Sequence, residues 1–548
     1  MAKIDRGTYF LLLIPIALLS FFLIYPVVRV TFEGLLSDTG KSFHKVISSY
    51  STQYTIIFTF SQAIVSTIMS VLVGLPGALL LSRLDFKGKS IIRPLIIIPF
   101  VLPPIVVVVG FMQMFGAYGL IDTFFMWLLQ SPTSVLNIAD GVVGIILAHT
   151  FYNAPLVILL VSASLERLNP EIEDAAEILG ATTYKRFSRI TLPHIFPAIT
   201  AAAILTFLFC FMSFPIVLAL GNGVYKTMEV QIWDSFRWSN YGEASSLVLI
   251  QILITMTLAI TYIQLGREKD QTVAPTSSMR SVKFRNYMKR EQVFIIGYII
   301  MVLILIGGPI VAILRAAIYD PLLKRYSLDG FVYLFTVGSN GGFGPLMNTL
   351  FYGGLATLLS ILLGIPLAYA HKSRARGLPT LSSIMVLLPL GISSISMAYG
   401  LMTVIAVPTG LNINPWPIIV IAQTIIGLPF TTRSIEISLR SIDPNILDQA
   451  DSLGASRFQR FFFIELPLLL PGIIVGAVFA FAMAIGEMSA TLFIALPQNY
   501  TLAVAIYNNL GVRKFLQAGA SALFLVAICV AAFFAMERVS KSGTGGAL

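Results

Sequence analysis

Residues 171–193 read EIEDAAEILGATTYKRFSRITLP, and residues 445–467 read NILDQADSLGASRFQRFFFIELP. In each stretch, an aspartate and the two residues after it are followed by three residues, a glycine, nine residues and then Ile-x-Leu-Pro. They lie 274 residues apart (445 minus 171), half the length of the 548-residue chain. Because a polar motif recurs at this distance in an otherwise apolar chain, the sequence predicts one unit that is duplicated and fused.

The composition places this unit in a membrane. Hydrophobic residues make up 57% of the chain, charged residues only 11%, and the mean hydropathy is +0.86. Soluble domains have about one quarter charged residues, so we predict a polytopic membrane protein. The net charge of +10 is distributed as expected for membrane orientation, and no nucleic-acid partner is predicted. Neither the two cysteines nor the four histidines show metal-ligand spacing, so no metal site is predicted: Cys210, Cys529, His44, His149, His194 and His371.

Apolar runs long enough to cross the bilayer recur along the whole chain. A span needs about 20 mostly apolar residues. The first run begins close to Met1, but its length and the lack of a small-residue cleavage site favour a retained helix over a signal peptide. We predict twelve spans: 9–31, 55–82, 92–115, 142–163, 196–220, 245–265, 292–316, 347–371, 382–407, 416–437, 470–495 and 516–537.

The basic residues orient these spans. With the N-terminus inside, most of the 36 Lys and Arg fall in cytoplasmic connections and termini, as is typical of membrane proteins. We therefore predict a multi-pass protein of the cell membrane, with both termini and both motif copies in the cytoplasm.

The repeat extends beyond the motif. Matched residues keep the offset of 274 around the motif and an offset of 290 nearer each N-terminus, and the longer outer loop 116–141 of the first half accounts for the difference. The predicted fold is all-α, with about twelve transmembrane helices in two parallel six-helix repeats. The predicted domains are residues 1–265, a basic cytoplasmic linker at 266–291, and residues 292–548. The matched pairs are Pro155 with Pro429, Pro197 with Pro471, Gly74 with Gly364, and Gly110 with Gly400.

Each motif copy begins with a short predicted helix, at 171–180 and 445–454. A preceding proline and a terminal glycine, which adopts the left-handed conformation easily, are the usual boundaries of a helix. The small alanines leave room for another surface to approach, so such a helix suits insertion into a partner's groove. The alternative is an ordinary connector that packs on its own membrane domain. The boundary residues are Pro170 and Gly180 in the first copy, and Pro444 and Gly454 in the second.

Both copies resemble the EAA loop of ABC importer membrane subunits: E-A-A, three residues, G, nine residues, I-x-L-P. An aspartate replaces the usual glutamate in both copies, and Gln449 replaces the first alanine of the second. The resemblance implies a type I importer transmembrane domain whose two loops supply coupling helices to two copies of an ATPase subunit. It also implies an extracytoplasmic binding protein that delivers the solute. The docking residues carried over are Asp174, Ala175, Ala176, Gly180, Asp448, Gln449, Ala450 and Gly454.

Fusion of two such subunits is similar to the permeases of ferric iron, thiamine and 2-aminoethylphosphonate importers. Segments 214–221, 227–232 and 486–491 resemble parts of that group. The resemblance implies transport of a small solute, of the ferric iron or thiamine class. No stretch matches the loop G-x-x-x-x-G-K-[ST] that cradles nucleotide phosphates. We therefore expect a chain that is not an enzyme and holds no cofactor, with ATP bound by the partner subunits.

One acid lies deep inside a predicted span. Glu487 falls within 470–495, Thr491 follows one helical turn later, and Ser213 is the counterpart of Glu487 in the first half. A charge at mid-bilayer costs about 3 kcal/mol on insertion scales and normally faces a cavity or a partner. Two interpretations stay open. Glu487, Ser489, Thr491 and Ser213 line the translocation path or its outer gate, or Glu487 is a packing acid that is hydrogen-bonded to a neighbouring helix.

Two other classes compete with the importer. A secondary transporter driven by an ion gradient would need several intramembrane ionisable residues, and Glu487 is nearly alone. A membrane-embedded enzyme would need a clustered catalytic set, and none is found in the sequence.

Overall fold

The computed structural model describes residues 6–36, 43–85, 89, 96, 99, 102–267, 282–283, 289–321, 325–338, 341–372 and 377–543. Nearly all regular structure in these ranges is helical, which confirms the predicted all-α class. Two short ladders are the exception: β1 (Leu84–Asp85) pairs in parallel with β2 (Val282–Lys283), and β3 (Tyr319–Asp320) pairs antiparallel with β4 (Arg325–Tyr326). Most of the predicted linker, 268–281 and 284–288, lies outside the described residues.

Within the described ranges, eleven helices are long and apolar enough to cross a membrane. They overlap eleven of the twelve predicted spans. The remaining one, 382–407, is divided between α19 (Leu378–Gly391) and α20 (Ser394–Gly400). The backbone is extended between these helices, where the Ser393 hydroxyl accepts a hydrogen bond from the amide of Ser396 and starts a new helix.

The contacts divide the chain into two compact units, and each unit combines both halves of the sequence. Unit 1 comprises Met1–Val46, Ile232–Met256 and Ser327–Leu548, and unit 2 comprises Ile47–Gln231 and Thr257–Tyr326. Unit 1, formed mainly by the second half of the sequence, thus contains the first span of the first half. Unit 2, formed mainly by the first half, contains the first span of the second half. The predicted boundaries at 265 and 292 concern the duplicated sequence and stay a prediction.

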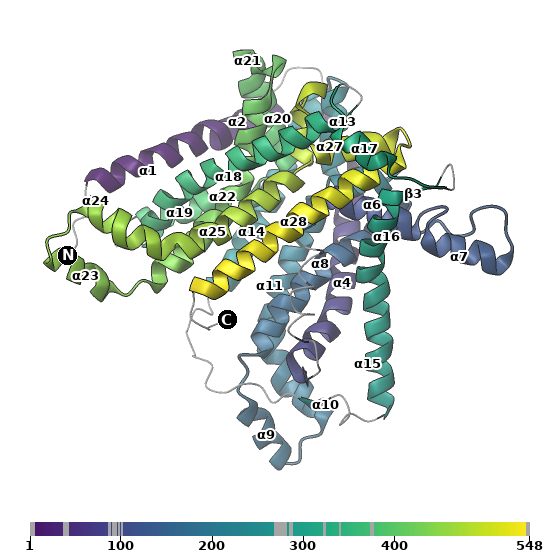
Figure 1. Cartoon of the computed structure of the whole chain (residues 1–548), viewed down its shortest axis with the longest axis horizontal. Coiled ribbons are helices and arrows are strands. Elements are labelled where there is room, and N and C mark those ends of the chain that lie inside the picture. The colour runs from purple at the N-terminus through teal and green to yellow at the C-terminus, as the bar shows by residue number, and fades with distance from the viewer. Residues whose placement is uncertain are drawn as a thin grey trace. The chain divides into compact units, whose positions relative to one another are not determined.

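Unit 1 is built around three long helices, α18, α22 and α25, which pack on one another side by side (Figure 1). In the first span, α1 packs on α18 and α2 packs on α20. The elements of this unit are α1 (Arg6–Leu19), η1 (Ser20–Ile24), α2 (Tyr25–Leu36), α17 (Asp329–Phe335), α18 (Phe343–Lys372), α19, α20, η5 (Leu401–Ala406), α21 (Val407–Thr409), η6 (Leu411–Ile413), α22 (Trp416–Ser441), α23 (Pro444–Ser452), α24 (Arg457–Arg460), η7 (Phe461–Glu465), α25 (Leu466–Gly486), α26 (Ser489–Ile494), η8 (Pro497–Asn499), α27 (Leu502–Gly511) and α28 (Phe515–Gly543).

Unit 2 repeats this arrangement with α4, α8 and α11 as its packed core. Its elements are α4 (Tyr50–Arg83), α6 (Pro104–Phe115), α7 (Leu120–Leu129), α8 (Gly141–Leu165), α9 (Pro170–Ile178), α10 (Thr183–Arg186), η2 (Phe187–Thr191), α11 (Leu192–Phe211), α12 (Pro215–Leu220), α15 (Lys289–Val302), η4 (Leu303–Gly307) and α16 (Gly308–Ile318). Three helices are shared between the units: α3 (Phe43–Ile47), α13 (Met228–Arg237) and α14 (Tyr241–Arg267).

The glycine pairs of the sequence mark close helix contacts in both units. A Cβ on Gly74 of α4 would lie 2.7 Å from the Cβ of Val157 on α8, and one on Gly364 of α18 would lie 3.1 Å from the hydroxyl of Thr431 on α22. Val157 and Thr431 are themselves 274 residues apart (431 minus 157). The glycines therefore allow the core helices of each unit to approach closely.

A second glycine pair contacts the first spans, each of which lies in the unit formed mainly by the other half of the sequence. A Cβ on Gly110 of α6 would lie 2.8 Å from the carbonyl oxygen of Pro309, and one on Gly400 of α20 would lie 3.0 Å from the Cβ of Pro26. Each of these prolines follows a π-helical turn, η4 or η1. Proline lacks the amide that an α-helical ladder needs, and a wider turn is one way for a helix to accommodate it.

Two predicted spans are interrupted at matching positions. The span predicted at 196–220 breaks between α11 and α12, and the span predicted at 470–495 breaks between α25 and α26. The short helices after the breaks begin 274 residues apart (489 minus 215). The prediction of one continuous span was wrong in both cases, because an apolar run does not distinguish one helix from two.

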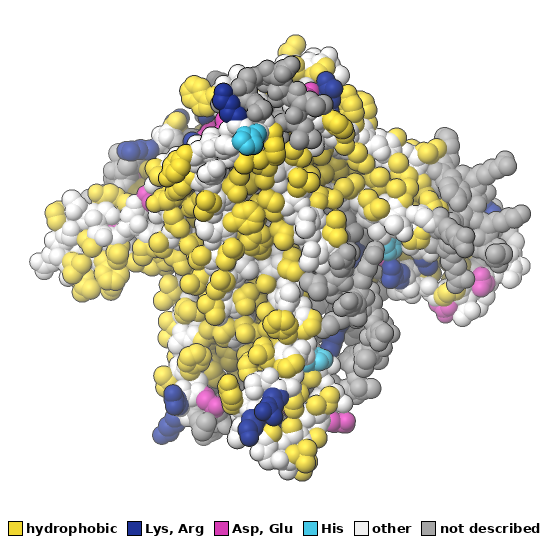
Figure 2. All heavy atoms as spheres, turned by 180° about the vertical axis from the view of Figure 1, so that it is seen from behind, with side chains coloured by type: hydrophobic (Ala, Val, Ile, Leu, Met, Phe, Trp, Pro, Cys, Tyr) yellow, Lys and Arg dark blue, Asp and Glu magenta, His cyan; other side chains and the backbone are white. Residues whose placement is uncertain are grey.

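The surface agrees with a membrane environment. On the face in Figure 2, hydrophobic side chains form a broad area across the middle of the described surface, and charged side chains lie mostly near its edges. Such large apolar surfaces are rare on soluble monomers and indicate contact with lipid or protein.

Candidate functional site: the two repeated loops

The helices predicted from the two motifs form as expected. The Asn169 side chain accepts a hydrogen bond from the amide of Glu171 at the start of α9, at 3.0 Å, and Asp443 accepts one from the amide of Asn445 at the start of α23, at 2.9 Å. Such side-chain caps satisfy amides that have no partner in the first turn of a helix. A proline follows each cap in the first helical position, so the local sequence fixes where each helix begins.

A glycine in the left-handed conformation ends each helix. The φ angle is +81° at Gly180 and +79° at Gly454, which confirms the predicted caps. A Cβ at either position would have nothing within 4 Å. Backbone conformation, not space, therefore requires glycine at these two positions.

Both helices leave apolar side chains in the open. No residue of α9 is buried, and Ile178 and Leu179 are 87% and 86% exposed. In the second loop, Leu453 is 88% exposed. Leu179 and Leu453 occupy the same motif position, directly before the left-handed glycine. Each loop therefore presents one leucine with almost no contact to its own unit.

The predicted docking residues are mostly accessible. Asp174 and Ala175 are exposed and Ala176 is half-buried, while Asp448 and Gln449 are exposed. Ala450 differs: it is 6% exposed and is packed within its own unit. The alanine of the second loop is therefore covered in this structure, which the motif alone did not indicate.

An ion pair at the same motif positions stabilises both loops. Arg186 contacts Glu177 at 2.5 Å, and Arg460 contacts Asp451 at 2.7 Å. In each loop the arginine lies nine residues after its acid and connects the motif helix to the short helix that follows. Sequence reasoning missed this pair, although both acids and both arginines are present at the offset of 274.

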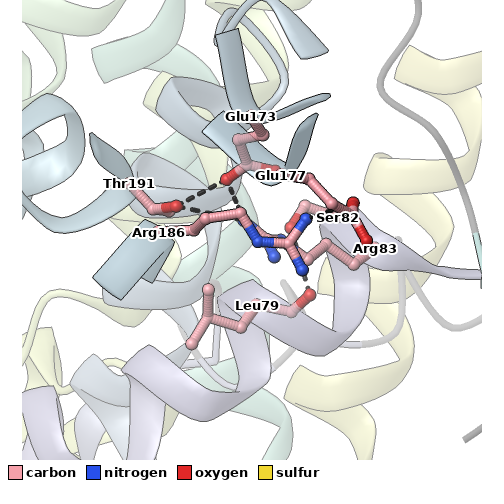
Figure 3. A network of polar contacts seen from close by, with 7 residues as sticks. All are labelled: Leu79, Ser82, Arg83, Glu173, Glu177, Arg186 and Thr191. Atoms are coloured by element: carbon pink, nitrogen blue, oxygen red, sulfur yellow. Dashed lines mark hydrogen bonds and ion pairs between the residues drawn. The ribbon is translucent and has the colours of Figure 1, made fainter. Parts of the chain in front are cut away.

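The first loop is also joined to α4 (Figure 3). The carboxylate of Glu173 accepts hydrogen bonds from the guanidinium of Arg83 at 2.6 Å and from the hydroxyl of Thr191 at 2.5 Å. Arg83 also contacts the Thr191 hydroxyl at 3.3 Å. These contacts join the end of a long core helix to both ends of the loop, and no sequence signal indicated a contact between residues so far apart.

The second loop is attached differently. Glu465 stands where Thr191 stands in the first loop, and it accepts hydrogen bonds from Arg460, at 2.9 Å, and from the phenol of Tyr369. Leu447 stands where Glu173 stands, and it packs against a cluster of Leu439, Ile442 and Leu469. Hydrophobic packing and a buried acid thus replace the α4 contact.

The acid proposed to lie in the translocation path caps a helix. One oxygen of Glu487 accepts from the amide of Ala490 at 2.7 Å, and the other accepts from the amide and hydroxyl of Thr491 at 2.9 and 2.8 Å. Glu487 follows the last residue of α25 and precedes α26, so Thr491 meets it across a break and not along one helix. Ser489 is half-buried, and Ser213 lies at the corresponding break of unit 2. The bonds of Glu487 favour a structural role.

The family assignment follows from a comparison with known proteins. Residues 70–267 and 360–542 each match the sequence profile of the binding-protein-dependent transport system inner membrane component. The chain belongs to this family. The double match confirms the resemblance to fused importer permeases, and the family is one of transport permeases and not of catalytic enzymes.

Curated relatives match this chain over most of its length. The putative ferric transport system permease protein FbpB 1 of Haemophilus influenzae is 26% identical over 512 residues, covering 90% of this chain and 79% of that protein. The thiamine transport system permease protein ThiP of Escherichia coli is 24% identical over 489 residues, covering 88% of each chain. A crystal structure of a bacterial alginate ABC transporter in complex with a periplasmic protein is 17% identical, covers 49% of this chain and 96% of that chain, and has a TM-score of 0.42.

Proposed function

We propose that this inner membrane component is the permease subunit of an ATP-driven importer, and that two copies of a separate ATPase subunit bind its two repeated loops. The observation that carries the proposal is the exposed leucine, Leu179 or Leu453, held before a left-handed glycine in each loop. Burying a leucine side chain gains about 1.5–3 kcal/mol, so a docked partner stabilises both loops. ATP is bound and hydrolysed by that partner.

The orientation follows from the position of the basic residues. Both loops and both termini face the cytoplasm, and an extracytoplasmic binding protein delivers solute to the opposite face, at loops 221–243 and 496–515. Closure of the ATPase pair draws α9 and α23 together and alternates access to the path. If the two attachments respond differently to this closure, the two loops move by different amounts.

The translocation path runs near the two broken spans. Ser213, which is buried, and Ser489, which is half-buried, lie beside the breaks, and Glu487 with Thr491 holds the shape of α26. The support for this placement is that an unwound segment within a membrane is tolerated where it lines a cavity or is buried in protein.

The solute is a small molecule or ion of the ferric iron or thiamine class. The printed names of the relatives, ferric and thiamine transport systems, support this choice. Titration of the cognate binding protein with ferric iron and with thiamine distinguishes the two, since the class that binds in the micromolar range or tighter identifies the solute.

The test of docking uses the complex of the full chain with its ATPase. Leu179→Asp with Leu453→Asp places a charge in each docking site, and we expect the co-purified ATPase to fall at least tenfold. Leu328→Asp is the matched control, because Leu328 is an exposed leucine outside the loops. Full ATPase recovery with the paired loop variant contradicts the proposal.

The alternative is a secondary transporter driven by an ion gradient. Proteoliposomes that contain the purified chain without any ATPase distinguish the two. Solute uptake driven by a proton or sodium gradient alone would establish the alternative, and uptake that requires the ATPase and ATP supports the importer.

A further inference from the structure

An unusual helix extends from unit 2 at the end opposite α9. Helix α7 projects from the end of α6 (Figure 1), within the loop that is longer in the first half of the sequence than in the second. Its surface is apolar and aromatic: Trp127 is 74% exposed, and Phe124, Leu128 and Leu129 are all more than half exposed. A ten-residue helix with this surface needs an apolar neighbour.

The single acid of α7 is turned inward. Asp122 is buried and accepts hydrogen bonds from the amides of Tyr118, Val135 and Leu136, at 2.7, 2.8 and 2.7 Å. It is the only charged residue from 116 to 139. The Asp122 carboxylate therefore holds the two ends of the loop together, and the exposed face of α7 carries no charged side chain.

An apolar groove begins where this loop begins and ends. Its lining includes Phe115, the last residue of α6, and Val143, near the start of α8, and it continues between α4, α8 and α15. Its volume is about 730 Å³, in the range of roughly 300–1,000 Å³ found for pockets that hold a whole ligand. Gly297 of α15 lines the groove, and a Cβ there would meet nothing within 4 Å.

The lining selects the occupant. Among the described residues that line the groove, Thr150 has the one hydrogen-bonding side chain, and its hydroxyl already donates to the carbonyl of Ile146 at 2.8 Å. The helices that form the groove are three of the membrane spans, so the groove opens to the bilayer. A polar solute or a hydrophilic peptide would lose its hydrogen bonds there, whereas a hydrocarbon chain loses none.

We propose that this groove and α7 form a phospholipid site in the leaflet opposite α9, with one acyl chain in the groove and α7 lying among the headgroups. Aromatic side chains favour this interface because one part of the ring system is apolar and another is polar. Trp127, on an apolar helix beside the ends of two spans, fits the same depth. The site belongs to unit 2 alone and is independent of the coupling loops.

The groove is tested by filling it. Gly297→Phe places a ring in the open space, and native mass spectrometry of the purified full chain counts retained phospholipid. We expect the lipid-bound fraction to fall severalfold. Gly354→Phe is the matched control, because Gly354 is an exposed glycine of span α18 with equally open space. Equal lipid retention in both variants, whether high or absent, overturns the site.

The position of α7 is tested by fluorescence. The difference between the emission of the wild-type protein and of Trp127→Phe isolates Trp127, and nanodiscs of brominated phosphatidylcholine report its depth. We expect strong quenching by bromine near the glycerol backbone and little by aqueous iodide. Quenching by iodide alone, or protection of Trp127 by the binding protein in place of lipid, contradicts the proposal.

Discussion

The two repeated loops share one surface and differ in how they are attached. Both have a capped start, a left-handed glycine, an exposed leucine and an ion pair across nine residues. The first is attached to its unit through Glu173, which bonds Arg83 and Thr191. The second is attached through packed Leu447 and the buried carboxylate of Glu465.

This difference separates the parts of the loop that face the proposed partner from the parts that face the unit itself. The proposed pair of ATPase subunits would require two equivalent surfaces, and the shared features are suited to this. No such symmetry is required of the inner contacts, and the residues that make them differ: Glu173 bonds to Arg83 in the first loop, whereas Leu447 packs on apolar side chains in the second. An ionic attachment and a hydrophobic one also respond differently to salt and to mutation, which makes the comparison testable.

The largest effect is expected at the left-handed glycines. Gly180→Val or Gly454→Val forces a β-branched residue into a backbone region that costs about 1–3 kcal/mol. We expect the backbone to adopt another conformation at this position, or the leucine before it to shift. ATPase co-purification should fall strongly for each variant and further for the pair.

Gly354→Val is the control for these variants, since it adds the same side chain to an exposed helical glycine. Comparison of the two single variants also measures whether the loops contribute equally to docking. Undiminished ATPase binding by the double variant would show that the caps do not position the docking surface.

Substitution of the loop arginines, Arg460 and Arg186, is expected to have the next largest effect. Arg460→Met leaves Glu465, whose side chain is only 6% exposed, with the Tyr369 phenol as its remaining side-chain partner, and such a loss costs about 1–3 kcal/mol. Arg186→Met leaves Glu177, which is 62% exposed and returns to water, at a cost of about 0–1 kcal/mol. Limited proteolysis of the loops reports the difference; equal cleavage of both variants would remove the distinction between the attachments.

Much of this arrangement could be predicted because local residues determine it. Proline and glycine set the bounds of α9 and α23, and apolar length set the positions of the spans. The glycine pairs indicated the duplication, but not the close helix contacts that they allow. The contact of Arg83 with Glu173 joins residues 90 positions apart, and only the packing of α4 against the loop brings them together.

The third prediction compares the breaks that end the long helices of the two units. Glu487 caps α26 with three hydrogen bonds, whereas α12 has no side-chain cap, and no bond of the Ser213 hydroxyl is found among the described residues. Removing a capping side chain costs about 0.5–2 kcal/mol. Glu487→Ala should therefore lower the thermal stability of the detergent-solubilised protein, Glu487→Gln should lower it less, and Ser213→Ala should leave it unchanged.

Transport assays decide between the two roles of Glu487. If Glu487→Gln keeps its stability and loses substrate-dependent transport, the carboxylate acts on the solute and the capping role is insufficient. The sequence could not choose, because a carboxylate in an apolar run looks the same in a pore and at a break. The break itself depends on tertiary packing that no single residue reveals.

The smallest expected effect tests the ionic attachment of the first loop. Glu173→Gln keeps an oxygen that accepts from Thr191 but removes the charge opposite Arg83, and a partly exposed pair of this kind contributes about 0.5–1 kcal/mol. Backbone hydrogen exchange in α9 should rise a few-fold, while Glu171→Gln, at an exposed site outside the Arg83 contact, should not change it.

Salt sharpens this last comparison. At about 1 M salt the screening length falls to roughly 3 Å, so exchange in α9 of the wild-type protein should approach that of Glu173→Gln. Exchange in α23 should change less, because Leu447 is held by apolar packing that salt does not screen, and the screened Arg460–Asp451 pair has its match in Arg186–Glu177 of the first loop. If both loops respond to salt alike, the ionic contact of Glu173 is not what attaches α9, and the two loops are attached by the same kind of force.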